Sequence, residues 1–339
     1  MICTVPIFHL MLYNNVFSGG WSPTTITALI LCAGGAIPAD YAFISLSCYF
    51  FCKKKNAKLK DAVRKVINIA VLTGVLWLLR YIILHGLYGK DLTNDLFVGL
   101  FLLHGAWWYI YAYVVMAMIY PFVNWLLQKI NFGVHCLLWA ASLVLFIAQG
   151  LENKMCWYND VLAFLFIYLT ISAVLRKREL GKRKMGDYKK LCLVGILLCY
   201  AILLAICCYV KYPAFNVSAD KATNICLLVM GRYNFIAAID GMLIFVFFLQ
   251  LELPYIRGVN KAAHYTIYIL LLHETCMGII GKCFGHLVGD VANYSVPQML
   301  LWSVLYLLAT FVFSICIGWI YENTIEKLVL CLNRRLFHD

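Results

Sequence analysis

KLCLVGILLCYAILLAICCYVK, residues 190–211, places twenty uncharged and mostly apolar residues between two lysines. The hydrocarbon core of a bilayer is about 30 Å thick, and a helix of roughly 20 apolar residues crosses it. The stretch therefore predicts a transmembrane helix. Apolar stretches of this length recur along the whole chain, so the same argument extends from this segment to the entire protein.

The composition agrees with this interpretation. Of 339 residues, 64% are apolar and only 13% are charged, and the mean hydropathy is +0.83; a soluble fold has about 25% charged residues. We predict an all-α, polytopic transmembrane helical bundle that forms a single domain over residues 1–339. About ten spans are expected, at residues 1–17, 30–52, 66–88, 99–127, 133–151, 158–176, 190–211, 225–251, 262–281 and 297–320.

Lysine and arginine gather in alternate loops. Two loops hold most of the lysine and arginine outside the predicted spans: KKKNAKLKDAVRK, residues 53–65, and RKRELGKRKMGDYKK, residues 176–190. Short loops rich in these residues remain on the cytoplasmic side of a membrane, so both termini are predicted to be cytoplasmic. The net charge of +12 is thus a topology signal and does not indicate nucleic-acid binding. Basic juxtamembrane loops also attract anionic lipid headgroups or a phosphorylated cofactor.

Ionisable side chains inside the predicted spans are candidates for function, because they are costly in lipid. Two readings remain open for the arginines: Arg80 pairs with Asp40 and Arg232 pairs with Asp240 as structural ion pairs, or the arginines line an outward-facing cavity. His273 and Glu274 are expected mainly to orient each other or a neighbouring helix. The full set is His9, Asp40, Arg80, His85, His104, Arg232, Asp240, His273 and Glu274.

His9 lies within the apolar run PIFHLMLY, residues 6–13. A histidine on a transmembrane helix can form a hydrogen bond across a helix interface and do nothing else. Its unperturbed pKa near 6.5 also suits it to accept a proton from a hydroxyl at neutral pH. From the residues alone, both roles are open for His9.

Several stretches resemble, in order and spacing, the membrane acyltransferase 3 family, which O-acetylates cell-surface polysaccharides and other carbohydrates. VPIFHLMLYNN is similar to the family's first span, and the second span usually ends in an SGYF-like element, here Ser47 to Phe50. The similar stretches are VPIFHLMLYNN, IPADYAFISLSCYFFCKKK, AWWYIYAYVVMAMIYPFVNWLL, YNFIAAIDGMLIFVFFLQL, VNKAA and IYILLLHET.

The resemblance implies helices around a central cavity, acyl-CoA entering from the cytoplasm, and a glycan or lipid-linked sugar hydroxyl entering from outside. His9 matches the family histidine that activates the acceptor. The expected donor is acetyl-CoA, in a bacterial plasma membrane. The expected cofactor-binding residues are Arg64, Lys65, Lys53 and Lys54, and the expected substrate or oxyanion residues are Trp108, Tyr111, Arg80 and Arg232.

The chain departs from the family pattern in its first two spans. The family usually carries an arginine upstream of the histidine, at a position before Met1 here, and an Arg-x-x-Arg element where this chain has Arg64 and Lys65. A lysine can still neutralise a phosphate, but without the bidentate geometry of arginine. Binding of the cofactor phosphates at this loop is therefore still expected.

Two other classes of protein fit the same composition. A polytopic transporter or flippase of a polysaccharide precursor or small metabolite also has many helices, intramembrane charges and a central cavity. A non-catalytic membrane scaffold is the third reading, and it tolerates the loss of His9. No metal is expected, because the sequence has no CxxC pair and no Cys/His spacing typical of zinc sites.

Overall fold

The computed structural model describes most of the chain. The described residues are 3–14, 16–18, 20–33, 35–54, 58–89, 107–152, 157–181, 188–252, 254–284 and 294–337. The expected features that lie outside these residues include His104, Lys55 of the first basic loop, residues 182–187 of the second basic loop and the start of the span at 99–127.

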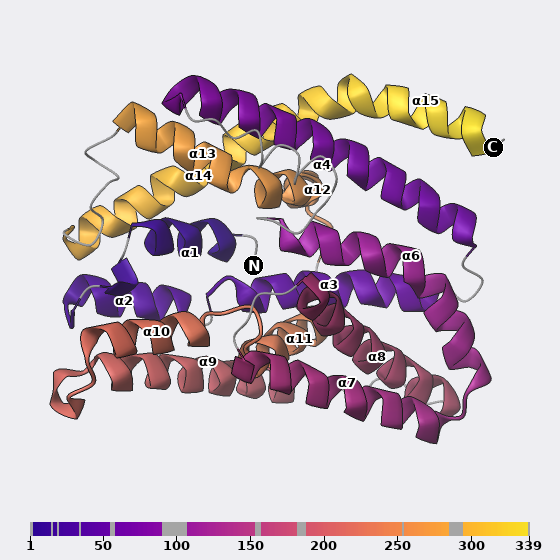
Figure 1. Ribbon diagram of the computed structural model, residues 1–339, viewed down its shortest axis with the longest axis horizontal. Coiled ribbons are helices and arrows are strands. Elements are labelled where there is room, and N and C mark those ends of the chain that lie inside the picture. Colours follow the sequence, from indigo (N-terminus) through magenta and orange to yellow (C-terminus); the bar gives the residue numbers. More distant parts are fainter. Residues whose placement is uncertain are drawn as a thin grey trace.

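The described residues form α-helices and two short 3-10 turns, with no strand among them, so the predicted all-α class is confirmed. Figure 1 shows most helices side by side along the long axis of the molecule. The helices are α1 (Thr4–Tyr13), α2 (Pro23–Cys32), α3 (Ile37–Lys53), α4 (Leu59–Tyr88), α6 (Trp108–Lys129), α7 (Phe132–Glu152), α8 (Trp157–Gly181), α9 (Lys189–Lys211), α10 (Ala219–Val229), α11 (Phe235–Leu249), α12 (Arg257–His264), α13 (Thr266–Phe284), α14 (Val296–Asn323) and α15 (Ile325–Phe337).

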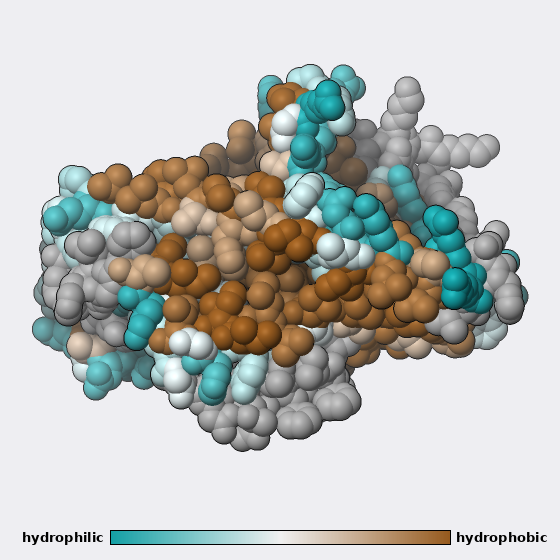
Figure 2. All heavy atoms as spheres, turned by 90° about the horizontal axis from the view of Figure 1, so that it is seen from above, coloured by the Kyte–Doolittle hydropathy of each residue, from teal (hydrophilic) through white to brown (hydrophobic). Residues whose placement is uncertain are grey.

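Eight helical stretches among the described residues are long and apolar enough to cross a membrane. The helix of the opening sequence, α9, is one of them, and it exposes Leu191, Val194 and Leu197. Figure 2 shows a continuous hydrophobic surface over the centre of one face, with hydrophilic side chains toward both ends. Such a band matches the hydrocarbon layer of a bilayer. The chain is a multi-pass membrane protein, while the count of ten spans and the sides of the termini stay predictions.

Two of the expected spans are interrupted. The expected span at 30–52 contains the break between α2 and α3, and the expected span at 225–251 contains the break between α10 and α11. Among its described residues, the expected span at 1–17 holds the ten-residue α1 and the start of the 3-10 turn Val16–Ser18. At 1.5 Å per residue, α1 is about 15 Å long. Figure 1 shows α1 beginning near the middle of the long axis.

The two breaks touch each other. Gly35, in the first break, has a φ of +65°, and a Cβ atom there would lie 2.9 Å from the carbonyl oxygen of Met230 in the second break. Only glycine takes this backbone conformation without strain. Helices α3 and α11 continue this close contact, because a Cβ atom at Gly241 would lie 2.5 Å from the Pro38 oxygen. Small residues permit such close helix packing in membranes.

Candidate active site

A cavity of about 420 Å³ lies where α1, α3, α6, α13 and the α10–α11 break meet. It combines an aromatic wall with ionisable groups. The aromatic wall consists of Trp107, Trp108 and Tyr109, and the ionisable or hydroxyl-bearing side chains that line the cavity are His9, Tyr13, Asp40, Arg232, His273 and Glu274. Pockets with an apolar wall and a few convergent polar groups are typical of ligand sites.

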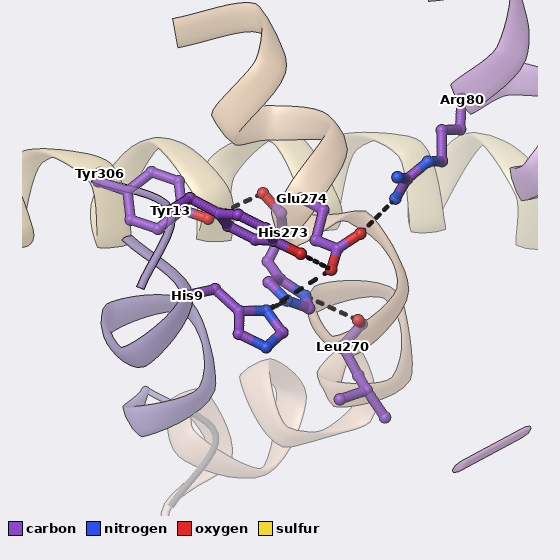
Figure 3. Close-up of polar contacts among 7 residues, drawn as sticks. All are labelled: His9, Tyr13, Arg80, Leu270, His273, Glu274 and Tyr306. Carbon is purple, nitrogen blue, oxygen red and sulfur yellow. Dashed lines mark hydrogen bonds and ion pairs between the residues drawn. The ribbon is translucent and has the colours of Figure 1, made fainter. Parts of the chain in front are cut away.

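His9 and His273 form the centre of this site. The Nδ1 atom of His9 lies 2.6 Å from the Nε2 atom of His273, and the Nδ1 atom of His273 lies 2.8 Å from the carbonyl oxygen of Leu270. Because a carbonyl only accepts, His273 carries its proton on Nδ1, and its Nε2 atom accepts from His9. His9 then carries its own proton on Nδ1. Figure 3 shows the second nitrogen of His9 on the opposite side of the ring from His273.

The carboxylate of Glu274 joins three helices beside this pair (Figure 3). It accepts a hydrogen bond of 3.0 Å from the Tyr13 hydroxyl of α1, and it forms an ion pair of 2.6 Å with Arg80 of α4. One of its oxygens also lies 3.7 Å from Nδ1 of His9. The carboxylate can therefore stabilise His9 when the ring becomes protonated, since a nearby negative charge favours the imidazolium.

Local structure places these groups. His9 and Tyr13 are four residues apart, so both lie on one face of α1. The hydroxyl of Tyr306 on α14 donates a hydrogen bond of 2.8 Å to the carbonyl oxygen of His273, which anchors α13 at this level. Phe8 of α1 is buried, and its ring lies 5.9 Å from that of Phe17. His9 is thus held by packing on one side and by the polar cluster on the other.

The α10–α11 break supplies Arg232. The hydroxyl of Tyr41 donates a hydrogen bond of 2.8 Å to the Arg232 carbonyl oxygen, and the Asn234 side chain accepts from two backbone N–H groups of α11. The Arg232 guanidinium lies 5.2 Å from the Trp108 ring centroid, and its Nη1 atom lies 3.7 Å from the carboxylate of Asp160. One buried nitrogen of this guanidinium, Nη1, has no hydrogen-bond partner among the described residues. The Arg232 side chain also lines the cavity, so its positive charge is available to a ligand there.

Of the two readings for the arginines, the one with structural ion pairs to Asp40 and Asp240 is wrong. Arg80 pairs with Glu274 and not with Asp40, and Arg232 lies beside Asp160 and not in a pair with Asp240. The sequence could not indicate this, because each ion pair joins helices that are far apart along the chain.

The other expected site residues are divided between this cavity, a second cavity and the ends of two helices. Trp108 lines the cavity, whereas Tyr111 is not among its lining residues. Lys65 lines a second cavity of about 300 Å³, together with Tyr113 and Asn68. The basic residues Lys53, Lys54 and Arg64 lie at the adjoining ends of α3 and α4.

A metal ion is a possible occupant of the polar cluster by residue type, because His9, His273 and Glu274 each offer a ligand atom within 4.8 Å of the others. Two nitrogens bound tetrahedrally at about 2.05 Å from one ion lie about 3.3 Å apart. The distance of 2.6 Å between Nδ1 of His9 and Nε2 of His273 is shorter than this and is a hydrogen-bond distance. The arrangement therefore fits a proton-bonded pair better than a metal site.

Sequence reasoning did not single out Tyr13. It named Asp40 only among the ionisable residues of the spans and as a structural partner for Arg80, and it gave His273 and Glu274 a mainly structural role. The spacing of Tyr13 from His9 was a usable signal for a shared helix face. For Asp40, the only signal was its position inside a predicted span.

The fold and the site together define a multi-pass helical membrane protein with an acid–base cluster facing an internal cavity. The acyltransferase domain of the acyltransferase 3 family matches residues 1–320, so the chain belongs to this family and is an acyltransferase. The resemblance inferred from the sequence is confirmed. No curated protein and no solved structure matches the chain.

Proposed function

We propose that this protein transfers an acyl group from cytoplasmic acyl-CoA to a hydroxyl of a cell-surface glycan or lipid-linked sugar. The proposed acyl group is acetyl, and the proposed location is the bacterial plasma membrane. The single observation that carries the proposal is the orientation of His9. Its Nδ1 atom donates to His273, and its ring lines the cavity. The Nε2 atom then has a free lone pair, which a general base needs.

The reaction follows from these positions. The Nε2 atom of His9 accepts the proton of the acceptor hydroxyl while the acceptor oxygen attacks the thioester carbonyl carbon. The negative charge that develops on the carbonyl oxygen is stabilised by Arg232, which lines the same cavity. The C–S bond then breaks, and the CoA sulfur leaves with the proton that His9 had accepted. Glu274 stabilises the imidazolium between these two steps.

The donor is proposed to arrive through the second cavity. Tyr113 lines that cavity and Tyr109 lines the first; they are one turn apart on α6, with ring centroids 6.3 Å apart. The second cavity also holds Glu322 and Glu326, which repel phosphates. We therefore place the uncharged arm of the CoA inside it, and the phosphates outside, against the basic cluster formed by Lys53, Lys54, Arg64 and Lys65.

The test uses purified protein in lipid vesicles, with acetyl-CoA on the side of the basic loops. Wild-type protein is expected to release CoA thiol and to acetylate a glycan acceptor. His9→Ala is expected to lose this transfer, and the control His85→Ala is expected to keep it, because His85 does not line the cavity. Transfer at the wild-type rate by His9→Ala would refute the assignment of the base.

A transporter is the second candidate, and one observation favours it. Two interrupted helices meet at Gly35 and Met230, and paired interrupted helices at mid-membrane are typical of transporter binding sites. Vesicles without acetyl-CoA separate the two functions. Movement of a labelled sugar across the membrane without any donor would support transport, whereas acylation that needs the donor supports the transferase.

A further inference from the structure

The carboxylate of Asp40 has no assigned partner in the site. Asp40 lies on α3, is 5% exposed and lines the 420 Å³ cavity. Glu274 and Asp160 both have ion-pair and hydrogen-bond partners. No hydrogen bond or ion pair to the Asp40 carboxylate is formed among the residues that the structure describes. A buried carboxylate without donors is costly, and inside a membrane such groups usually serve a ligand.

Two features compensate the charge of Asp40 without occupying its oxygen atoms. Asp40 lies in the first turn of α3, where the helix dipole favours a negative charge. Arg232 is close enough to act on Asp40 electrostatically. A carboxylate offers about four lone-pair sites for hydrogen-bond donors. These sites remain available to a molecule in the cavity.

The neighbouring groups define the donors that such a molecule must bring. The free nitrogen of His9 requires one hydroxyl, and Asp40 requires a second donor within the same cavity. The aromatic wall of Trp107, Trp108 and Tyr109 offers apolar faces. An acceptor that satisfies all three is polar at two or more points and has an apolar ring face between them.

We propose that Asp40 binds the acceptor: it accepts a hydrogen bond from a second hydroxyl of a neutral, polyhydroxylated acceptor while His9 activates the first. This inference rests on the proposed acyltransferase function and adds to it a residue that determines specificity for the acceptor. A monohydric alcohol can use only His9, and an amine would use Asp40 as a counter-ion. The three kinds of acceptor therefore distinguish the proposal from its alternatives.

The experiment compares Asp40→Asn with Asp240→Asn in detergent-purified protein supplied with acetyl-CoA. Asp240 is a matched control, because it is 3% exposed and has an oxygen without a hydrogen-bond partner among the described residues, yet does not line the cavity. The probes are methyl glucoside, 1-propanol and glucosamine. The readouts are the KM for each acceptor, the KM for acetyl-CoA, and release of CoA thiol in the absence of acceptor.

Asp40→Asn is expected to raise the KM for methyl glucoside about tenfold or more, the usual effect of losing a hydrogen bond to a charged group. The KM for acetyl-CoA, transfer to 1-propanol and acceptor-free release of thiol are expected to stay near wild type. Asp240→Asn is expected to leave all of them unchanged. An equal loss for propanol and glucoside would overturn the proposal, as would a wild-type preference for glucosamine that Asp40→Asn abolishes.

Two further measurements keep the test decisive. If Asp40→Asn does not elute as a folded species, Asp40→Ser replaces it; failure of both to fold would show that Asp40 is structural and would overturn the proposal. If the wild type transfers nothing, the proposed function fails, and equilibrium dialysis with labelled methyl glucoside still tests Asp40, because binding requires no donor. Weaker binding by Asp40→Asn than by Asp240→Asn then supports an acceptor site, and equal binding contradicts it.

Discussion

The Nδ1 atom of His9 lies 2.6 Å from the Nε2 atom of His273, although 264 positions separate the two residues in the chain. The Leu270 carbonyl at the far side of His273 fixes the direction of both protons. His9 therefore has one nitrogen committed to this hydrogen bond and one available for chemistry. The partner ring determines which nitrogen of the proposed base is free, as is usual for functional histidines.

Replacing His273 with phenylalanine tests this relationship. The variant keeps a ring of similar size but removes the acceptor for the His9 proton, so His9 is free to adopt the wrong tautomer. We expect kcat to fall about 10- to 100-fold, by analogy with the loss of a partner that orients a metal-binding histidine, with the KM for acetyl-CoA unchanged. His135→Phe is the control, because His135 is buried on α7 and contacts Ser172. An unchanged kcat in His273→Phe would contradict the tautomer argument.

The Arg80–Glu274 ion pair is expected to stabilise the fold as a unit. Removing one partner leaves an uncompensated charge. In fully buried pairs this costs about 3–5 kcal/mol, and the partial exposure of Arg80 and Glu274 makes the expected cost smaller. Arg80→Gln and Glu274→Gln should each lower the thermal midpoint of the detergent-solubilised protein. The double variant should be more stable than the sum of the single effects implies. Additive losses in this double-mutant cycle would show that the two side chains do not act together.

Arg232 is expected to act on the transition state. Arg232→Gln removes the positive charge from a residue that lines the cavity, and we expect kcat to fall about 10²- to 10³-fold, as when one oxyanion donor is lost. Arg232→Lys should recover part of this loss, since a lysine supplies the charge without the guanidinium geometry. Steady-state kinetics with acetyl-CoA measures both. A change confined to KM would assign Arg232 to ground-state binding instead.

The contact between the two interrupted helices predicts a stability effect at Gly35. Gly35→Ala introduces strain at a φ of +65° and a Cβ atom 2.9 Å from the Met230 oxygen. Gly89→Ala is the matched control, because Gly89 has a φ of +63° and open space around it. A left-handed conformation costs a non-glycine residue about 1–2 kcal/mol, so any larger loss in Gly35→Ala measures the clash. Equal thermal midpoints for the two variants would show that the helix contact is loose.

Chelation provides a test of the proton-bonded interpretation of the cluster of His9, His273 and Glu274. Dialysis against EDTA is expected to leave acyl transfer unchanged, and Zn²⁺ is expected not to increase it. Transfer assays before and after dialysis measure this, with metal content determined in parallel. Loss of activity on chelation that Zn²⁺ restores would replace the acid–base assignment with a metal site.

The fold class was predictable because it depends on local properties of the chain. A stretch such as residues 190–211 has too few charged groups to remain in water and is long enough to cross a bilayer. The position of His9 in a candidate site was also accessible, because its segment resembles a family motif. The breaks near Gly35 and Met230 were not predicted, since both fall within apolar stretches that continue on either side, and hydropathy does not record a local change of backbone direction.

The sequence by itself determined that this protein is a helical membrane protein with a histidine near its start and few ionisable side chains in its spans. Only the tertiary structure decided which of these side chains meet: His9 with His273, Arg80 with Glu274, and Asp40 with the cavity. The physical reason is that helix formation in lipid satisfies the backbone within each segment. Partners between segments depend on how helices far apart in sequence pack, and no local pattern records that packing.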